Sequence, residues 1–452
     1  MAARPDRWSG GECGAFGGTI DEICWKDAIP ALGKSAGSRL KGREMLLNRW
    51  ENVNTRRGDD LAFRHPERPT GVSFREIDEM AREVDVSGKV VPAIGESLDF
   101  FSSLIAAWRV GKPALLMENK TSRIRPISCE IPAGTVLIKQ ACGASGVERS
   151  LFFGESQILA EGERNIRGLG LHEFRRGLAA ISLAHSYGFG CLALPLLLAG
   201  VPVEVVSGPL PMFLQAALDR GGEIFLPGVP AIWKTWWQTG VAAHPEISLA
   251  LSAGSPLSLE LESTVYADCG LKIHNFYGTS ETGAIAFDDS LAPRKRADFV
   301  GKILPGIDVA TDEAGRLAVA SDACALGVDS PAWEDEFHGR FYGTLDEGEV
   351  SDGGIFIRHC VGGAINVAGR KVSPIRLQTI LEQLDGVAAA VVERGESRDF
   401  ERFGEIRVRL SVKPGHEAKV IREQLRQQVE SWEMPRHWEF VPVEGGLKPH
   451  LA

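Results

Sequence analysis

The sequence predicts an α/β protein with a large N-terminal domain of mostly parallel sheets flanked by helices. Short apolar runs typical of buried strands alternate with longer segments of helical periodicity, as at 90–94 and 100–110. The chain has 452 residues, which exceeds the size of one ordinary domain. We therefore expect a second, smaller domain at the C-terminal end.

Composition excludes several classes of protein. The apolar fraction of 44% and the charged fraction of 24% are those of a globular protein, and the net charge of −10 argues against nucleic acid as a partner. No apolar run approaches the ~20 residues of a membrane span, and the N-terminus has no signal-peptide core. The eight cysteines include no C-x-x-C pair, so we expect neither a zinc site nor a disulfide framework, and a reduced, cytoplasmic protein.

The first part of the chain alternates strands and helices. We expect strands at 61–63 and 90–94, and the end of another strand at 72–74. Ser73 can cap the helix after it, and Glu76 three residues later completes a capping box. A helix from 100 to 110 follows, with its apolar residues on one face, namely Phe101, Leu104, Ile105 and Trp108.

A glycine-rich segment follows the strand predicted at 135–138. The loop from 140 to 150 contains Gly143, Ser145 and Gly146, and Arg149 is its nearest cation. Backbone amides of such a loop commonly cradle phosphate groups. A plain glycine turn is the alternative interpretation.

The middle of the chain predicts further βα units. A buried strand from about 179 ends near His185, which is either a residue of a ligand pocket or a satisfied core histidine. A strand at 200–206, a helix near 213–218 and a helix carrying three tryptophans follow, and we interpret Trp233, Trp236 and Trp237 as structural. The strand at 248–251 leads into the turn Ser252–Leu257.

The segment from His274 to Gly283 carries the densest chemistry. An alternating apolar run enters it as a strand, which we expect Tyr277 and Gly278 to end. Three hydroxyls and a carboxylate then fall within four residues, namely Thr279, Ser280, Glu281 and Thr282. Hydroxyls and amides beyond a strand end suit a phosphate, and the carboxylate suits Mg²⁺. A polar β-turn is the alternative.

In the last third of the chain we expect two strands, at 300–309 and 315–319, around a glycine turn. Asp346 follows them and is either a ligand-binding acid or part of a solvated acidic loop. Ser373 and Pro374 suit the N-cap and first position of a helix with an apolar stripe. Strands at 387–392 and 406–412 and a helix through 420–429 follow. These form a small α+β domain of roughly ninety residues.

The motif Tyr277-Gly278-Thr279-Ser280-Glu281 resembles the central motif of the adenylate-forming superfamily, which includes acyl-CoA synthetases, aryl-CoA ligases, peptide-synthetase adenylation domains and luciferases. Segments from about 58 to 448 resemble that family in order, including a small β-subdomain at 300–319. The resemblance implies an N-terminal AMP-binding domain at 1–358 and a mobile C-terminal domain at 359–452. It also implies that a small carboxylic acid reacts with MgATP to give an acyl adenylate, which a thiol of CoA or of acyl-carrier-protein phosphopantetheine then captures.

The resemblance assigns roles to particular residues. It places Mg²⁺ on Glu281, ribose on Asp346, the acyl pocket at His185, and a cation bridging carboxylate and α-phosphate at Lys448. The nucleotide would contact three further groups: Gly143, Ser145 and Gly146; Gly254, Ser255 and Pro256; and Tyr277, Gly278, Thr279, Ser280 and Thr282.

Three departures from the family keep an alternative function open. Arg149 stands where the family's phosphate loop ends in a lysine. Residues 359–366 lack the arginine, the acid and the lysine that the family has at its hinge. Lys448 is displaced by one residue and is alternatively a tail lysine. The alternative is a non-catalytic or half-reaction homologue that binds a nucleotide or scaffolds a partner. Neither the acid nor the thiol acceptor follows from the sequence.

Overall fold

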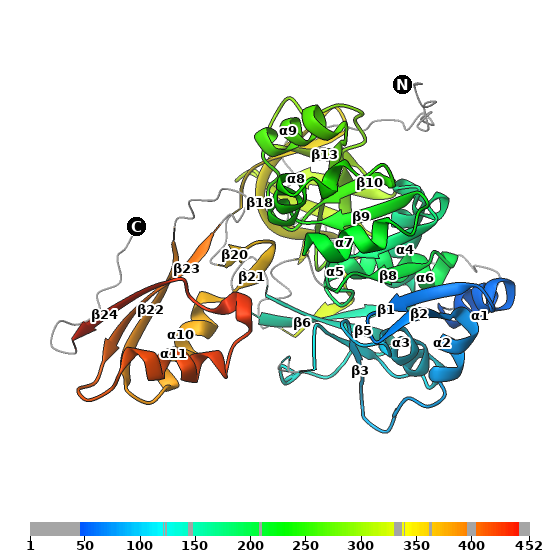
Figure 1. Ribbon diagram of the computed structural model, residues 1–452. Helices are drawn as coiled ribbons and strands as arrows, with labels where there is room; N and C mark the ends of the chain where they lie inside the picture. Colours follow the sequence, from blue (N-terminus) through cyan, green and yellow to red (C-terminus); the bar gives the residue numbers. More distant parts are fainter. Residues whose placement is uncertain are drawn as a thin grey trace.

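The computed structural model describes residues 46–442 except 121, 123, 143–147, 208–209, 330–336, 339, 361–363 and 396–403. A large part carries two sheets with their helices, and a smaller part at the C-terminal end lies to one side of it (Figure 1). The predicted α/β fold class is confirmed. The domain boundary at 358/359 stays a prediction.

The larger sheet has the strand order β14-β15-β18-β19-β13-β12-β11-β10-β9-β7-β8-β1-β2, with β17 paired to β18. Its parallel half consists of β1 (Leu61–His65), β7 (Arg176–Ala179), β8 (Val203–Val205), β9 (Ile224–Gly228), β10 (Ile247–Ser252) and β11 (Ile273–Thr279). β2 (Arg68–Ser73) pairs antiparallel to β1 at the edge. In β10, Leu251 and Ala250 point into different cores on the two faces. This burial on both faces explains the continuous apolar runs of the sequence.

Helices cover both faces of this sheet. On one face α7 (Pro211–Leu218), α8 (Pro230–Gln238) and α9 (Leu259–Cys269) share a core in which Trp233 and Trp236 are fully buried. The structural interpretation of these two tryptophans is therefore confirmed. On the other face lie α4 (Glu155–Gly168) and α6 (Leu194–Ala199), which pack against each other. Short 3₁₀ turns occur at Leu171–Glu173 and Val241–Ala243.

The smaller sheet of the large part has the order β16-β6-β5-β4-β3. Its strands are β3 (Val91–Ile94), β4 (Ala114–Met117), β5 (Thr135–Cys142), β6 (Glu148–Gly154) and β16 (Gly327–Val328), of which the first three run parallel. The predicted loop at 140–150 is too wide, because Gln140 pairs with Ser150 and the two strands extend along most of it. Gly143, Ser145 and Gly146 lie outside the described residues.

Helix α3 (Phe100–Arg109) is buried from Phe100 to Trp108. The prediction of a single apolar face was therefore wrong, because α1 (Leu46–Arg57), α2 (Phe74–Met80), β3 and β4 all contact this helix. Ser73 caps α2, and the Glu76 side chain accepts from the Ser73 backbone, so the predicted capping box is confirmed.

The antiparallel half of the larger sheet contains β12 (Gly283–Phe287), β13 (Phe299–Ile303), β14 (Ile307–Thr311), β15 (Arg316–Ser321), β17 (Phe337–His338), β18 (Phe341–Ser351) and β19 (Gly354–Cys360). The prediction that Tyr277 and Gly278 end their strand was wrong. β11 continues to Thr279, because after pairing with β10 through Asn275 it pairs antiparallel with β12 from Phe276 onward.

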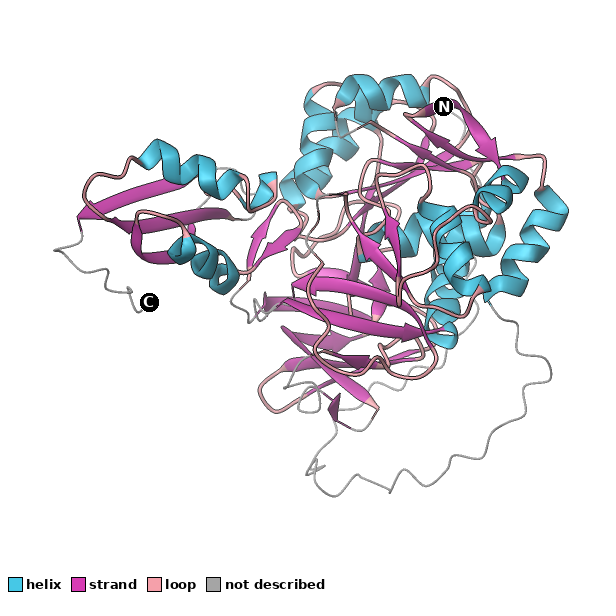
Figure 2. Cartoon of the chain, turned by 90° about the horizontal axis from the view of Figure 1, so that it is seen from below, coloured by secondary structure: helices cyan, strands magenta, loops and turns pink. Residues whose placement is uncertain are grey.

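The C-terminal part begins with the hairpin β20 (Ile365–Val367) and β21 (Arg370–Val372). The helices α10 (Pro374–Gln383) and α11 (Ala418–Arg426) then pack on a sheet of β22 (Val387–Gly395), β23 (Glu405–Val412) and β24 (His437–Pro442), around a core of their own (Figure 2). Ser373 caps α10 and Pro374 follows it, as predicted.

Candidate functional site

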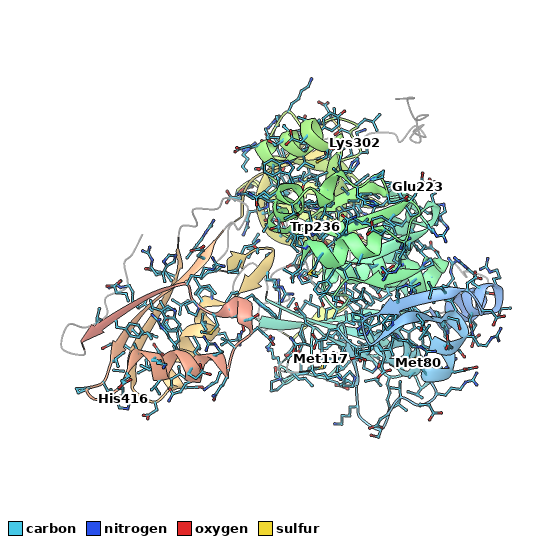
Figure 3. The ribbon with its side chains drawn as sticks, viewed as in Figure 1. Met80, Met117, Glu223, Trp236, Lys302 and His416 are labelled. Carbon is cyan, nitrogen blue, oxygen red and sulfur yellow. The ribbon has the colours of Figure 1, made fainter. Side chains whose placement is uncertain are left out.

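A cavity of about 1360 Å³ lies between the large part and the C-terminal part. The segments after the carboxyl ends of β4, β10 and β11 form one wall, and β18, β19, the β20–β21 hairpin and the turn after α11 complete it. Met117 lies on this wall, and Figure 3 shows it on the side of the large part that faces the C-terminal part. Ligands of open α/β sheets bind at this edge because strand ends and the following loops converge there.

The turn between β11 and β12 is closed by its own side chains. The hydroxyls of Thr279 and Thr282 lie 3.0 Å apart, and the Thr282 amide donates to Thr279 Oγ1. Thr282 is fully buried and its hydroxyl donates to the Gly283 carbonyl, so it supports the turn from behind. A Cβ on Gly278 would lie 2.5 Å from the Gly283 carbonyl oxygen, which requires glycine at this position. Ser280 lies on the cavity wall, and its hydroxyl accepts from Ser186.

Glu281 is buried at the edge of the cavity, with 5% of its surface exposed. Its Oε1 accepts a hydrogen bond from Arg149 Nη2 at 2.6 Å, and the same guanidinium nitrogen donates to the Tyr342 hydroxyl. A cation and a carboxylate therefore lie side by side on the wall. Such a pair can receive a phosphate on the cation and a metal ion on the carboxylate.

Asp346 lies in strand β18, so the solvated-loop alternative is wrong: Glu347 and Glu349 also belong to this strand. The Tyr277 hydroxyl donates to Asp346 Oδ2 at 2.6 Å. Asp346 also lines the cavity wall. Thr344 stabilises the strand, since its buried hydroxyl donates to the Leu317 carbonyl.

His185 caps the short helix α5 (Ser186–Gly188), which continues as a π-helical segment (Phe189–Ala193) into α6. The predicted strand ends earlier than expected, at Ala179, because β7 pairs with β8 only as far as Val205. His185 Nδ1 accepts from the Tyr187 amide at 3.4 Å, which puts the ring proton on Nε2. Burial lowers the pKa of His185, and Glu118 nearby opposes that shift. The neutral ring can donate one hydrogen bond into the cavity.

Gly254, Ser255 and Pro256 line the cavity beyond β10. Gly254 has φ +83°, a conformation that favours glycine. The Ser255 hydroxyl is buried and has no hydrogen-bond partner among the described residues. Buried hydroxyls are normally satisfied, so this one suits a ligand atom.

Sequence reasoning missed a buried ion pair behind the turn. Lys139 Nζ lies 3.1 Å from Glu161 Oε2, both side chains are about 3% exposed, and Lys139 also lies over the rings of Phe153 and Phe189. Glu161 packs against Gly283, where an added Cβ would lie 3.1 Å from its carboxyl carbon. The one signal in the sequence was a lysine within an apolar strand.

The cavity carries an excess of positive charge. Its described lining residues include ten Lys or Arg and six Asp or Glu, a net charge of +4 in a chain of net charge −10. Clefts lined by one sign of charge concentrate ligands of the other sign. The arrangement therefore favours a polyanion.

The metal fits this site only together with a ligand. Among the described residues no group of three His, Cys, Asp or Glu side chains can hold a metal ion. Mg²⁺ is usually bound by one or two carboxylates plus phosphate oxygens, so Glu281 fits it beside a bound triphosphate.

Lys448 lies outside the described residues. No helix in the described part of the chain is long and apolar enough to cross a membrane.

Comparison with known proteins gives consistent results. The family described as AMP-binding enzyme matches residues 162–322. A fatty acid–[acyl-carrier-protein] ligase from Streptomyces coeruleorubidus is 30% identical over 240 residues, which are 47% of this chain and 45% of the relative. An anthranilate–CoA ligase from Pseudomonas aeruginosa is 32% identical over 181 residues, 36% of this chain and 34% of the relative. The chain thus spans less than half the length of these two relatives.

The solved structure of a double mutant of o-succinylbenzoate CoA synthetase from Bacillus subtilis, bound to the product analogue OSB-NCoA, has a TM-score of 0.74 at 15% identity, covering 87% of this chain and 94% of that one. In complex with the intermediate OSB-AMP, the synthetase has a TM-score of 0.60 at 14% identity with the same coverage. The fold of the present chain is thus similar to both structures, with the higher TM-score for the first.

Proposed function

We propose that this chain is a member of the adenylate-forming superfamily, that it uses ATP to activate a carboxylic acid as an acyl adenylate, and that it then transfers the acyl group to a thiol. The observation that carries this proposal is the cavity wall itself. Asp346, Ser280 and the Glu281–Arg149 pair lie along one positively charged cavity at the carboxyl ends of parallel strands. In this proposal, Asp346 accepts hydrogen bonds from ribose, and Ser280 and Arg149 donate hydrogen bonds to phosphate oxygens. Glu281 is the carboxylate for the metal ion.

In the first step, an oxygen of the substrate carboxylate attacks the α-phosphorus of ATP. The bond from that phosphorus to the oxygen bridging it to the β-phosphorus breaks, and pyrophosphate leaves. Asp346 accepts from ribose, while Ser280 and Arg149 donate to phosphate oxygens. His185 Nε2–H donates to the substrate carboxylate and holds it in line. Mg²⁺, held by Glu281, would neutralise phosphate charge when bound. Positioning and charge stabilisation supply nearly all of the catalysis.

In the second step, a thiol sulfur attacks the carbonyl carbon of the acyl adenylate. The bond between that carbon and the AMP oxygen breaks, AMP leaves, and the thiol proton passes to solvent. We propose that residues 359–452 change their position between the steps. Lys448 stays our predicted cation for the first step.

The acceptor is CoA or the phosphopantetheine of an acyl carrier protein. One curated relative is named as an acyl-carrier-protein ligase and another as a CoA ligase. Both thiols end in the same phosphopantetheine arm, so the cavity suits either.

ATP–pyrophosphate exchange over a panel of aliphatic and aromatic acids tests the first step, and it needs no thiol. We expect exchange with at least one acid. A chain that binds ATP without exchange for any acid would favour a second candidate, a nucleotide-binding homologue without activity. The observation favouring that candidate is the segment 359–366, which lacks the arginine, the acid and the lysine that the family has at its hinge.

A further inference from the structure

The C-terminal part contacts the end of β4 through an arginine held from two sides. Glu118 follows β4, and its Oε2 lies 2.9 Å from Nη1 of Arg370, the first residue of β21. The Arg370 guanidinium carbon lies 3.7 Å from the ring centre of Trp432. The ring belongs to the C-terminal part and the carboxylate to the large part. Stacking on a ring fixes the plane of a guanidinium and so directs it at its partner.

The turn that carries Trp432 is itself fixed. Glu430 and Glu433 close a reciprocal capping box around it, and Glu433 forms an ion pair with Arg376 at the start of α10. Glu430 also accepts a hydrogen bond from Asn119 Nδ2 of the large part at 3.2 Å. The platform under Arg370 is therefore built within the C-terminal part, and the two consecutive residues after β4 reach it.

The hairpin lies directly on the cavity wall. Asn366 Nδ2 donates to the Gly254 carbonyl at 2.8 Å. A Cβ on Gly254 would lie 3.3 Å from the Gly369 carbonyl oxygen, so the two backbones pack closely. Arg370 follows Gly369 directly in the chain. A contact that holds the Arg370 side chain therefore also holds the hairpin in place.

We propose that the Glu118–Arg370–Trp432 contact, here called the latch, holds the β20–β21 hairpin against the cavity for the second step of the reaction. This inference rests on the proposed function. Glu118 and Arg370 act as positioning residues, since neither is assigned a contact with the reacting atoms. The TM-score is higher for the synthetase bound to OSB-NCoA than for the synthetase bound to OSB-AMP.

Limited trypsin digestion of the full chain, without ligands, tests the latch independently of catalysis. The bonds after Arg370 and Lys371 lie in the hairpin, and cleavage there follows the population in which the hairpin is released. We expect Glu118→Gln to be cleaved at Lys371 about tenfold faster than the wild type. The matched control is Glu439→Gln, which removes an ion pair with Arg409 inside the C-terminal sheet and should be cleaved at the wild-type rate.

A double-mutant cycle separates the latch from general loosening. If the two side chains act through one contact, Glu118→Gln and Arg370→Gln together should be cleaved at Lys371 no faster than either single variant. Wild-type cleavage of a folded Glu118→Gln would overturn the latch. An equal rise in Glu439→Gln would overturn it as well.

The kinetic arm uses an acid that supports exchange in the wild type. We expect Glu118→Gln to lower the single-turnover rate of thioester formation, with CoA as probe acceptor, about five- to tenfold more than it lowers pyrophosphate exchange. Equal losses in both steps would overturn the role in the second step. If the wild type exchanges with no acid, the proposed function fails, and the trypsin experiment still decides whether the latch exists.

Discussion

Two walls of the same cavity are built differently. The β11–β12 turn is part of the core: its hydroxyls bond to each other, Glu281 pairs with buried Arg149, and Glu161 packs behind Gly283. The β20–β21 hairpin is attached through half-exposed polar contacts, at Asn366 and at Arg370. Buried pairs are costly to break, whereas exposed ones contribute little. The comparison indicates that the β11–β12 turn is a fixed wall of the cavity and that the β20–β21 hairpin is a releasable one.

The largest expected effect lies on the fixed wall. Glu281→Gln should lower ATP–pyrophosphate exchange by about 10²–10³-fold, because the carboxylate for Mg²⁺ and the partner of Arg149 are both lost. Exchange measured over a series of Mg²⁺ concentrations checks this. Because the carboxylate is buried, circular dichroism must show that the variant is folded. A folded variant with wild-type exchange contradicts the assignment.

Breaking the buried Lys139–Glu161 pair behind the turn should cause the largest loss of unfolding free energy among these variants. Lys139→Met leaves the Glu161 carboxylate buried without its cation and should cost about 3–5 kcal/mol of unfolding free energy, as broken buried pairs do. Chemical denaturation measures it. Lys139→Met combined with Glu161→Gln should recover most of the loss, and no recovery would show that packing rather than charge explains it.

At the edge of the fixed wall, Asp346→Asn should weaken ATP binding by about 1–3 kcal/mol, since the bonds of ribose to a charged acceptor are replaced by weaker ones. Isothermal titration with ATP reports it. Tyr277→Phe is the matched variant, because it removes the 2.6 Å bond to Asp346 and leaves the carboxylate. It should cost less, and the reverse order would contradict ribose binding by Asp346.

Acidification should lower the free energy of unfolding. Burial lowers the pKa of His185, and the same holds for His274, so both bind protons more readily in the unfolded chain. Stability should therefore fall as pH drops below about 6.5, the ordinary histidine value, toward the folded pKa. His185→Asn, which cannot titrate, should flatten the dependence of the unfolding midpoint on pH. An unchanged slope would contradict it.

The smallest effect is expected on the releasable wall. Asn366→Ala removes two hydrogen bonds, one to the Gly254 carbonyl and one from the Gly369 amide, and should change the unfolding free energy by about 1 kcal/mol or less for each. It should nevertheless speed trypsin cleavage at Lys371, because the bond to Gly254 joins two parts of the molecule. A large loss of stability would show that the hairpin belongs to the core.

Local patterns predicted much of the fold. The capping box at Ser73 and the cap at Ser373 involve residues three apart, so their spacing in the sequence is enough to find them. The strand through Tyr277 was cut short because its second pairing, with β12, satisfies backbone groups that a single-strand view leaves open. The Glu118–Arg370 contact joins residues 252 positions apart, and no periodicity reports such a contact. What sequence patterns miss here is long-range pairing of charge.

The most direct test of the central claim is mass spectrometry of the wild-type chain incubated with ATP, Mg²⁺ and a mixture of carboxylic acids, without thiol. We predict an ion with the mass of an acyl adenylate, formed together with pyrophosphate and about 10²–10³-fold less abundant when Glu281→Gln replaces the wild type. A folded wild-type chain that binds ATP and yields no acyl adenylate from any acid would contradict the account.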